Sequence, residues 1–289
     1  MCGISGYLDL DRGVDTDTLR RMTDVIRHRG PDDEGYALIG KEGAAFYRGE
    51  DTLPQLSLPP LEQGGSGTFL GLGHRRLSIL DLSAAGHQPM ALPERDLTLT
   101  YNGELYNYLE LRAQLEALGH RFRTNCDTEV LLHAYCQWGE DCLDHFNGMW
   151  GFALWDGKEN KLFCARDRLC QDPTIRRTFN RPYLAANLMY RLGDYDDETL
   201  IEGMRALPPG HKLVVQVAPE GDRIVSVTVT PYWTLHVRYD DSYTQAQWEE
   251  QVAEEFSRAC RWRLRSDAPV AALLSGGLDS SLVCAISSV

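Results

Sequence analysis

Short runs of alternating apolar and polar residues, separated by turn-rich loops, fill most of the chain before residue 232. Alternation with a period of two is typical of strands that bury one face and expose the other. Such runs occur at residues 4–10, 69–82, 97–107, 149–156, 161–168, 212–217 and 223–230. Tight-turn sequences such as DGKEN and APEGD join the later runs, which predicts antiparallel hairpins.

Three helices are predicted among and after these strands. The first spans about Tyr108 to Leu118 and is ended by Gly119, and the second starts at Asp127 as N-cap, with Glu129 in its first turn. A third, at about 244–264, places Trp248 and Phe256 on one side and suits a connector between domains. Together the elements predict an α+β domain.

The last residues follow a different pattern. The apolar run VAALL at 270–274 predicts a buried parallel strand, and the loop SGGLDSS at 275–281 and a helix start follow it. Strand, glycine loop and helix occur in the order that phosphate binding requires. One strand and one helical turn cannot bury their own apolar faces, so we expect the truncated start of a second, α/β domain.

Composition narrows the function classes. The formal net charge of -13 disfavours binding to nucleic acid or to an anionic membrane. No apolar run approaches the roughly 20 residues needed to cross a bilayer, and the start lacks a basic segment followed by an apolar one, so we expect a cytoplasmic protein. The 8 cysteines form no CxxC pair or zinc-ligand spacing, which predicts free thiols and no metal site.

Cys2 differs from the other cysteines by its position directly after Met1. If Met1 is removed, the α-amine of Cys2, with a pKa of about 8, can take the proton from its own thiol, with a pKa of about 8.5. One residue then supplies both nucleophile and base. Many unrelated proteins also begin Met-Cys, and a small core residue is the alternative.

Six motifs make the nucleophile interpretation specific. Residues 1–168 closely resemble the glutamine amidotransferase domain of glutamine-dependent asparagine synthetases, through MCGISG, RHRGPDDEG, HRRLSILDLS, YNGELYN, DTEVLL and FNGMWGFALWD. The resemblance implies an N-terminal-nucleophile hydrolase with an αββα sandwich. It also implies a ligase in which glutamine is hydrolysed through a Cys2 thioester, and the ammonia serves the ATP-dependent conversion of aspartate to asparagine.

The resemblance assigns roles to the motif residues. The catalytic group is Cys2, with the Asn102 side-chain amide and the Gly103 N–H as donors to the oxyanion. Arg76 matches the position that binds the glutamine carboxylate, and Asp127 and Glu104 match those that hold its amine. The backbone of Leu77, Ser78, Ile79 and Leu80 lines the same pocket, and the RHRGPD loop lies beside it. The alternatives are a tight turn at Asn102-Gly103, a surface charge for Arg76 and only an N-cap for Asp127.

SGGLDSS resembles the pyrophosphate-binding loop of the ATP pyrophosphatase domain. The implied ATP-binding residues are Leu273, Ser275, Gly276, Gly277, Asp279 and Ser280, and Mg²⁺ is expected to accompany ATP. The alternative is a plain Ser/Gly turn. Glutamine, aspartate and ATP are the substrates implied for a complete family member, and a homodimer is compatible with the resemblance.

We therefore expect three regions: an amidotransferase domain at 2–215, a hairpin and connector helix at 216–265, and the start of a synthetase domain at 266–289. The match breaks after Leu169, so residues 169–200 are predicted to be irregular, and the pattern of a second domain stops eight residues after Ser281. At most the glutaminase half is then expected to work.

Two alternative functions are an inactive truncated or mis-spliced product acting as a binding module, and another N-terminal-cysteine amidohydrolase. Arg76 with Asp127 argues against the latter.

Overall fold

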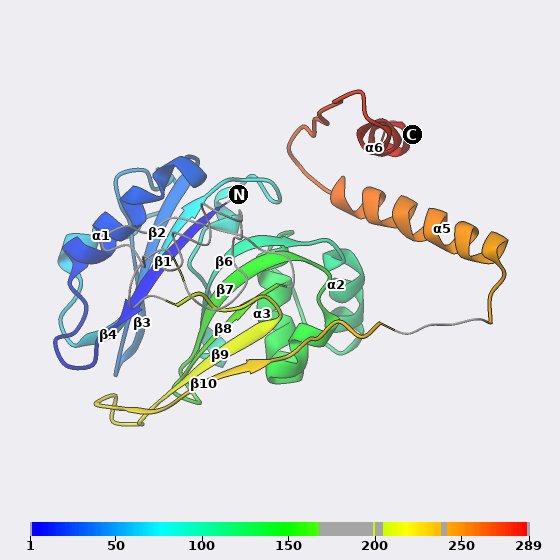
Figure 1. The fold of residues 1–289 in the computed structure, drawn as a ribbon. Coiled ribbons are helices and arrows are strands. Elements are labelled where there is room, and N and C mark those ends of the chain that lie inside the picture. The colour runs from blue at the N-terminus through cyan, green and yellow to red at the C-terminus, as the bar shows by residue number, and fades with distance from the viewer. Residues whose placement is uncertain (1, 168–198, 200–204, 238–241, 288–289) are drawn as a thin grey trace.

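The computed structural model describes residues 2–167, 199, 205–237 and 242–287 (Figure 1). The break predicted after Leu169, and residues 169–198 of the segment predicted to be irregular, lie outside the described residues.

Two antiparallel sheets form the body of the described chain (Figure 1). The four-stranded sheet has the order β1-β4-β2-β3, with β1 (Gly3–Leu8), β2 (Asp33–Gly40), β3 (Gly43–Tyr47) and β4 (Thr68–Arg76). The six-stranded sheet has the order β10-β9-β8-β7-β6-β5, with β5 (Met90–Leu92), β6 (Leu97–Leu105), β7 (Gly148–Asp156), β8 (Lys161–Arg166), β9 (His211–Val217) and β10 (Ile224–Pro231).

Helices cover the outer face of each sheet. The helix α1 (Thr16–Val25) packs on the four-stranded sheet, and α2 (Tyr108–Ala117) and α3 (Asp127–Trp138) pack on the six-stranded sheet (Figure 1). The layers are therefore helix, sheet, sheet and helix, which confirms the predicted α+β class and αββα sandwich.

Strand alternation explains how one strand serves two cores. In β2, Leu38 lies in a buried cluster with Leu19 of α1, whereas the next residue, Ile39, lies in a cluster with Trp155 of the other sheet. Successive side chains of a strand point to opposite faces, so an apolar run can fill both layers. The uninterrupted burial of β2 follows from this position between α1 and the second sheet.

The predicted helices are confirmed to within one or two residues. The connector helix α5 (Gln245–Arg263) begins after Thr244, whose side chain and that of Gln247 form a capping box. Asp127, however, is the first residue of α3 and not its N-cap, which is Cys126. The N-cap prediction was wrong because the Asp127 carboxylate accepts hydrogen bonds from β6 instead.

The hairpins β7/β8 and β9/β10 are confirmed. The alternative of a turn at Asn102-Gly103 was wrong, because β6 continues through both residues, which pair with Gly151 and Trp150 of β7. A partner strand that extends along the whole of β6 leaves no room for a reversal there. The domain boundary expected at residue 215 falls inside β9 and stays a prediction.

The strand predicted at residues 270–274 is absent from the described chain, where Leu273 and Leu274 are 96% and 63% exposed. A parallel strand needs a neighbouring strand to satisfy its backbone groups, and none in the described part of the chain pairs with this run. The helix predicted after the glycine loop is present as α6 (Leu278–Ser287). Among the described helices, none has the length and apolar character needed to cross a membrane.

Candidate active site

Cys2 directly precedes β1 and lies opposite the end of β4. The antiparallel register pairs Gly3 with Arg75, so Cys2 comes beside the residues that follow β4. The Leu77 N–H donates to Cys2 Sγ over 3.3 Å, and Arg29 Nε donates to the Cys2 carbonyl over 3.0 Å. The RHRGPD loop therefore holds the main chain of Cys2, as the sequence predicted for a loop beside the site.

The Cys2 thiol borders a cavity of about 200 Å³. Eight of the residues predicted for the amidotransferase site line it: Cys2, Arg76, Leu77, Ile79, Leu80, Gly103, Glu104 and Asp127. Ser78 and Asn102 are not among the lining residues. Instead, the Ser78 N–H donates to Asp32 Oδ2 over 2.8 Å, which fastens the RHRGPD loop to the wall of this cavity. We call this cavity, with its lining residues, the Cys2 pocket.

Arg76 is 4% exposed and is held by backbone carbonyls. Its Nη1 donates to Ser83 O over 2.8 Å, and its Nη2 donates to Leu80 O over 3.3 Å and to Asp81 O. A side chain at Gly86 would place its Cβ 2.0 Å from Arg76 Nη2, so only glycine leaves room for the guanidinium. Its burial excludes the surface-charge alternative. Within the described part of the chain, no carboxylate forms an ion pair with Arg76.

Asp127 also lines the pocket and is 5% exposed. Its Oδ2 accepts from Tyr101 Oη over 2.8 Å and from the Leu105 N–H over 2.9 Å. Burial raises the pKa of Asp127, while these hydrogen bonds act in the opposite direction. Burial and then the charge of Asp127 raise the pKa of Glu104. Burial also raises the pKa of the Cys2 thiol, and the Leu77 N–H opposes that effect.

Comparisons of sequence point to one family. Residues 66–185 match the family described as a glutamine amidotransferase domain, and residues 251–288 match asparagine synthase. The chain is 34% identical to asparagine synthetase [glutamine-hydrolyzing] 3 of Bacillus subtilis, over 99% of this chain and 45% of that protein. It is 31% identical to putative asparagine synthetase [glutamine-hydrolyzing] 2 of Methanocaldococcus jannaschii, over 99% of this chain and 56% of that protein.

The chain is therefore similar in sequence to glutamine-hydrolysing asparagine synthetases. The amidotransferase match and the shorter synthase match lie in the same chain. The chain spans about half the length of the curated relatives that it matches.

Solved structures support the fold. Glutamine phosphoribosylpyrophosphate amidotransferase from B. subtilis aligns with a TM-score of 0.53 and 17% identity, over 81% of this chain and 49% of that chain. A second structure, described as the allosteric regulatory enzyme of purine biosynthesis, aligns with a TM-score of 0.55 and 18% identity, over 81% and 50%. At these identities the likeness concerns the fold alone.

The Asn102-Gly103 pair lies in β6, the strand that passes the Cys2 pocket. Gly103 lines the pocket, and a Cβ there would come within 2.4 Å of Met149 O. Asn102 Oδ1 is buried and has no hydrogen-bond partner among the described residues. A buried amide oxygen without a hydrogen-bond partner is costly, although the Asn102 side chain does not line the Cys2 pocket.

Sequence reasoning missed several pocket residues: Gly86, Gln88, Tyr101, Tyr106, Cys126, Thr128 and Met149. Gln88 is an example. Its Oε1 accepts from the Tyr101 N–H over 2.8 Å, and its Nε2 donates to Thr128 Oγ1 over 3.3 Å, which joins β6 to α3. A single glutamine between two strands carries no sequence signal. Tyr101 could have been found, because it precedes the Asn-Gly pair directly.

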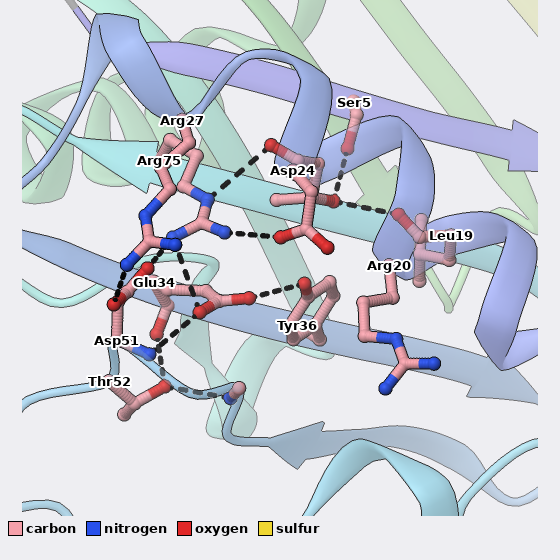
Figure 2. A network of polar contacts seen from close by, with 12 residues as sticks. Ser5, Leu19, Arg20, Asp24, Arg27, Glu34, Tyr36, Asp51, Thr52 and Arg75 are labelled. Atoms are coloured by element: carbon pink, nitrogen blue, oxygen red, sulfur yellow. Dashed lines mark hydrogen bonds and ion pairs between the residues drawn. The ribbon is translucent and has the colours of Figure 1, made fainter.

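Arg75, the neighbour of Arg76 in β4, points to the other face of the sheet and is surrounded by carboxylates (Figure 2). It is 1% exposed, and Nη2 lies 2.5 Å from Asp24 Oδ1 of α1. Nη1 lies 2.6 Å from Asp51 Oδ2 and 3.3 Å from Glu34 Oε2 of β2. This network, in which Arg75 and Glu34 are buried and Asp24 is half exposed, fastens α1 and β2 to the strand end that carries Arg76.

The predicted nucleotide loop lies apart from the Cys2 pocket, at the start of α6. The hydroxyls of Ser275 and Ser280 are 2.9 Å apart, and the Gly277 N–H donates to Ser275 Oγ over 3.4 Å. Gly276 has a φ of 80°, which favours glycine. Leu273 precedes this exposed loop and Asp279 lies within it.

Replacing Arg75 with alanine leaves the buried Glu34 without its cation. We expect Arg75→Ala to lower the free energy of unfolding by about 3–5 kcal/mol, measured by urea denaturation. Arg20→Ala, which removes surface pairs with Asp17 and Glu62, should cost no more than about 1 kcal/mol. The double variant Arg75→Ala/Glu34→Gln should lose less than the sum of its single variants. Additive losses would contradict a coupled network.

Proposed function

We propose that this chain hydrolyses the side-chain amide of glutamine at Cys2 and releases ammonia. One observation carries the proposal: a buried guanidinium, Arg76, and a buried carboxylate, Asp127, border one pocket with a thiol, and the two charges are not paired with each other. Buried charges are unfavourable unless a partner compensates them. A free amino acid brings both partners, a carboxylate and an ammonium group.

The roles of the pocket residues follow from that match. Arg76 is proposed to bind the α-carboxylate of glutamine, and Asp127 and Glu104 its α-ammonium. The backbone of Leu77, together with that of residues 78–80, forms the wall along which the substrate lies. Asp127 Oδ2 already accepts from Tyr101 and Leu105, which fixes the carboxylate in place before the substrate arrives.

The chemistry proposed for Cys2 begins with removal of Met1. The α-amine then takes the thiol proton, and Sγ attacks the amide carbon of glutamine. The tetrahedral oxyanion accepts from the Asn102 amide and the Gly103 N–H, and the loss of one such donor typically costs about a hundredfold or more in rate. As the C–N bond breaks, the protonated α-amine of Cys2 gives its proton to the leaving nitrogen, which departs as ammonia. Water then opens the thioester, which yields glutamate and the free thiol.

The wider role rests on the longer relatives, which are named asparagine synthetases. We propose that the ammonia serves an ATP-dependent conversion of aspartate to asparagine, of which this chain holds the glutaminase half. The exposed loop formed by Leu273, Ser275, Gly276, Gly277, Asp279 and Ser280 would bind the ATP phosphates with Mg²⁺. Its position before the N-terminus of α6 supports this, since backbone N–H groups there favour anions. A cytoplasmic location, a homodimer, and no binding to nucleic acid or membrane complete the proposal, and the net charge of -13 supports the last point.

Ammonia release should depend on Cys2. With glutamine as substrate, Cys2→Ala should lose essentially all activity, because the nucleophile is gone. Cys136→Ala is the matched control, since Cys136 does not line the pocket, and it should retain activity. A variant with one residue added before Cys2 should also be inactive, because its α-amine is then an amide. Ammonia release by Cys2→Ala equal to that of the parent would refute the proposed function.

Arg76 should matter for substrates that carry a carboxylate. We expect Arg76→Ala to raise the KM for glutamine by about 10- to 100-fold, the loss expected for a charged hydrogen-bonded pair, and Arg76→Lys to raise it less. The KM for an amide without an α-carboxylate should change little in either variant. Steady-state ammonia assays measure both. Equal effects on the two substrates would show that Arg76 serves the fold and not carboxylate binding.

A further inference from the structure

The segment that leaves α5 returns to the Cys2 pocket and contacts one of its walls at Tyr106. Arg265 Nη1 donates to Tyr106 O over 2.6 Å, and its guanidinium makes two 2.6 Å bonds with the carboxylate of Glu110. Arg263 lies over the Tyr106 ring, 4.5 Å from its centroid. In Figure 1 the end of α5 that leads to α6 is the end nearer to the N-terminus, which agrees with these contacts. These residues are 155 or more positions apart in sequence.

The same segment contacts a second wall of the pocket. The Asp267 N–H donates to Ile79 O over 2.9 Å, and the Asp81 N–H donates to Asp267 Oδ2 over 2.7 Å. Ile79 lines the pocket. Asp81 has a φ of 51°, a left-handed conformation that only surrounding contacts maintain in a residue other than glycine.

One peptide unit connects Asp267 with Arg76. The peptide between Leu80 and Asp81 gives its N–H to Asp267 Oδ2, and its carbonyl accepts from Arg76 Nη2 over 3.3 Å. Rotation of this peptide would move both bonds together, because its six atoms are planar. Asp267 therefore fixes the orientation of a carbonyl that holds the buried guanidinium.

We propose that Arg265 and Asp267 form a clasp across the Cys2 pocket and that Asp267 is a positioning residue for Arg76. This inference rests on the proposed function, since it gives Arg76 a ligand to bind. The clasp orients the loop at residues 79–81 without touching the substrate. Its loss should weaken glutamine binding and leave the reaction at the thiol unchanged, because nothing in the clasp contacts Cys2.

The test compares Asp267→Ala, Asp267→Asn and Arg258→Ala in the full chain after Met1 removal. Asp267→Ala should raise the KM for glutamine about fivefold, as expected for one or two lost hydrogen bonds, with kcat within twofold. Asp267→Asn keeps an oxygen that can accept from the Asp81 N–H and should stay near the parent. Arg258→Ala is the matched control, since Arg258 pairs with Glu255 within α5 and stacks on Trp262. It should change nothing.

Amide hydrogen exchange gives a readout that does not depend on activity. The segment around residues 78–83 should exchange faster in Asp267→Ala than in the parent or in Arg258→Ala, because the Asp81 N–H has lost its acceptor. Unchanged exchange there would overturn the clasp whatever the glutaminase assay shows. Faster exchange with an unchanged KM would overturn the positioning role. If exchange is faster in Asp267→Ala but the parent chain releases no ammonia, the proposed function is refuted and the clasp remains supported.

Discussion

The antiparallel pairing of β1 with β4 is the constraint on which the candidate site depends. It brings the second residue of the chain beside residues 76 and 77, and the Leu77 N–H donates to Cys2 Sγ over 3.3 Å. Although β1 is an edge strand, its partner β4 is also paired with β2, so the residues that contact Cys2 follow an interior strand of the sheet. The side chain proposed as the nucleophile thereby obtains a fixed position.

Two adjacent arginines of β4 show how this sheet separates stability from binding. Arg75 points to α1 and has three carboxylates around it, Asp24, Glu34 and Asp51 (Figure 2). Arg76 points to the pocket, and its partners in the described chain are backbone carbonyls. Alternation along a strand produces this difference within one residue step. Arg75, which is paired with carboxylates, holds the framework, and we propose that Arg76, which has no carboxylate partner in the described chain, binds an anionic ligand.

Local sequence patterns predicted the elements whose structure depends on nearby residues, such as α2, the capped α5 and the β7/β8 hairpin. The predictions were wrong where a residue distant in sequence determines the local structure. Asp127 bonds to β6 and not to its own helix end, Asn102-Gly103 is held straight by β7, and residues 270–274 have no partner strand in the described chain. The motifs predicted eight of the lining residues, whereas Gln88 and Asp267 act through contacts that no local pattern encodes.

The most direct test of the central claim is mass spectrometry of the chain after reaction with an electrophilic glutamine analogue that carries a free α-amine and α-carboxylate. The account predicts a single covalent adduct on Cys2, whose formation glutamine slows and Arg76→Ala nearly abolishes, while an analogue without the α-carboxylate reacts slowly with both proteins. Labelling of other cysteines at the same rate, or labelling of Cys2 that neither glutamine nor Arg76→Ala affects, would contradict it.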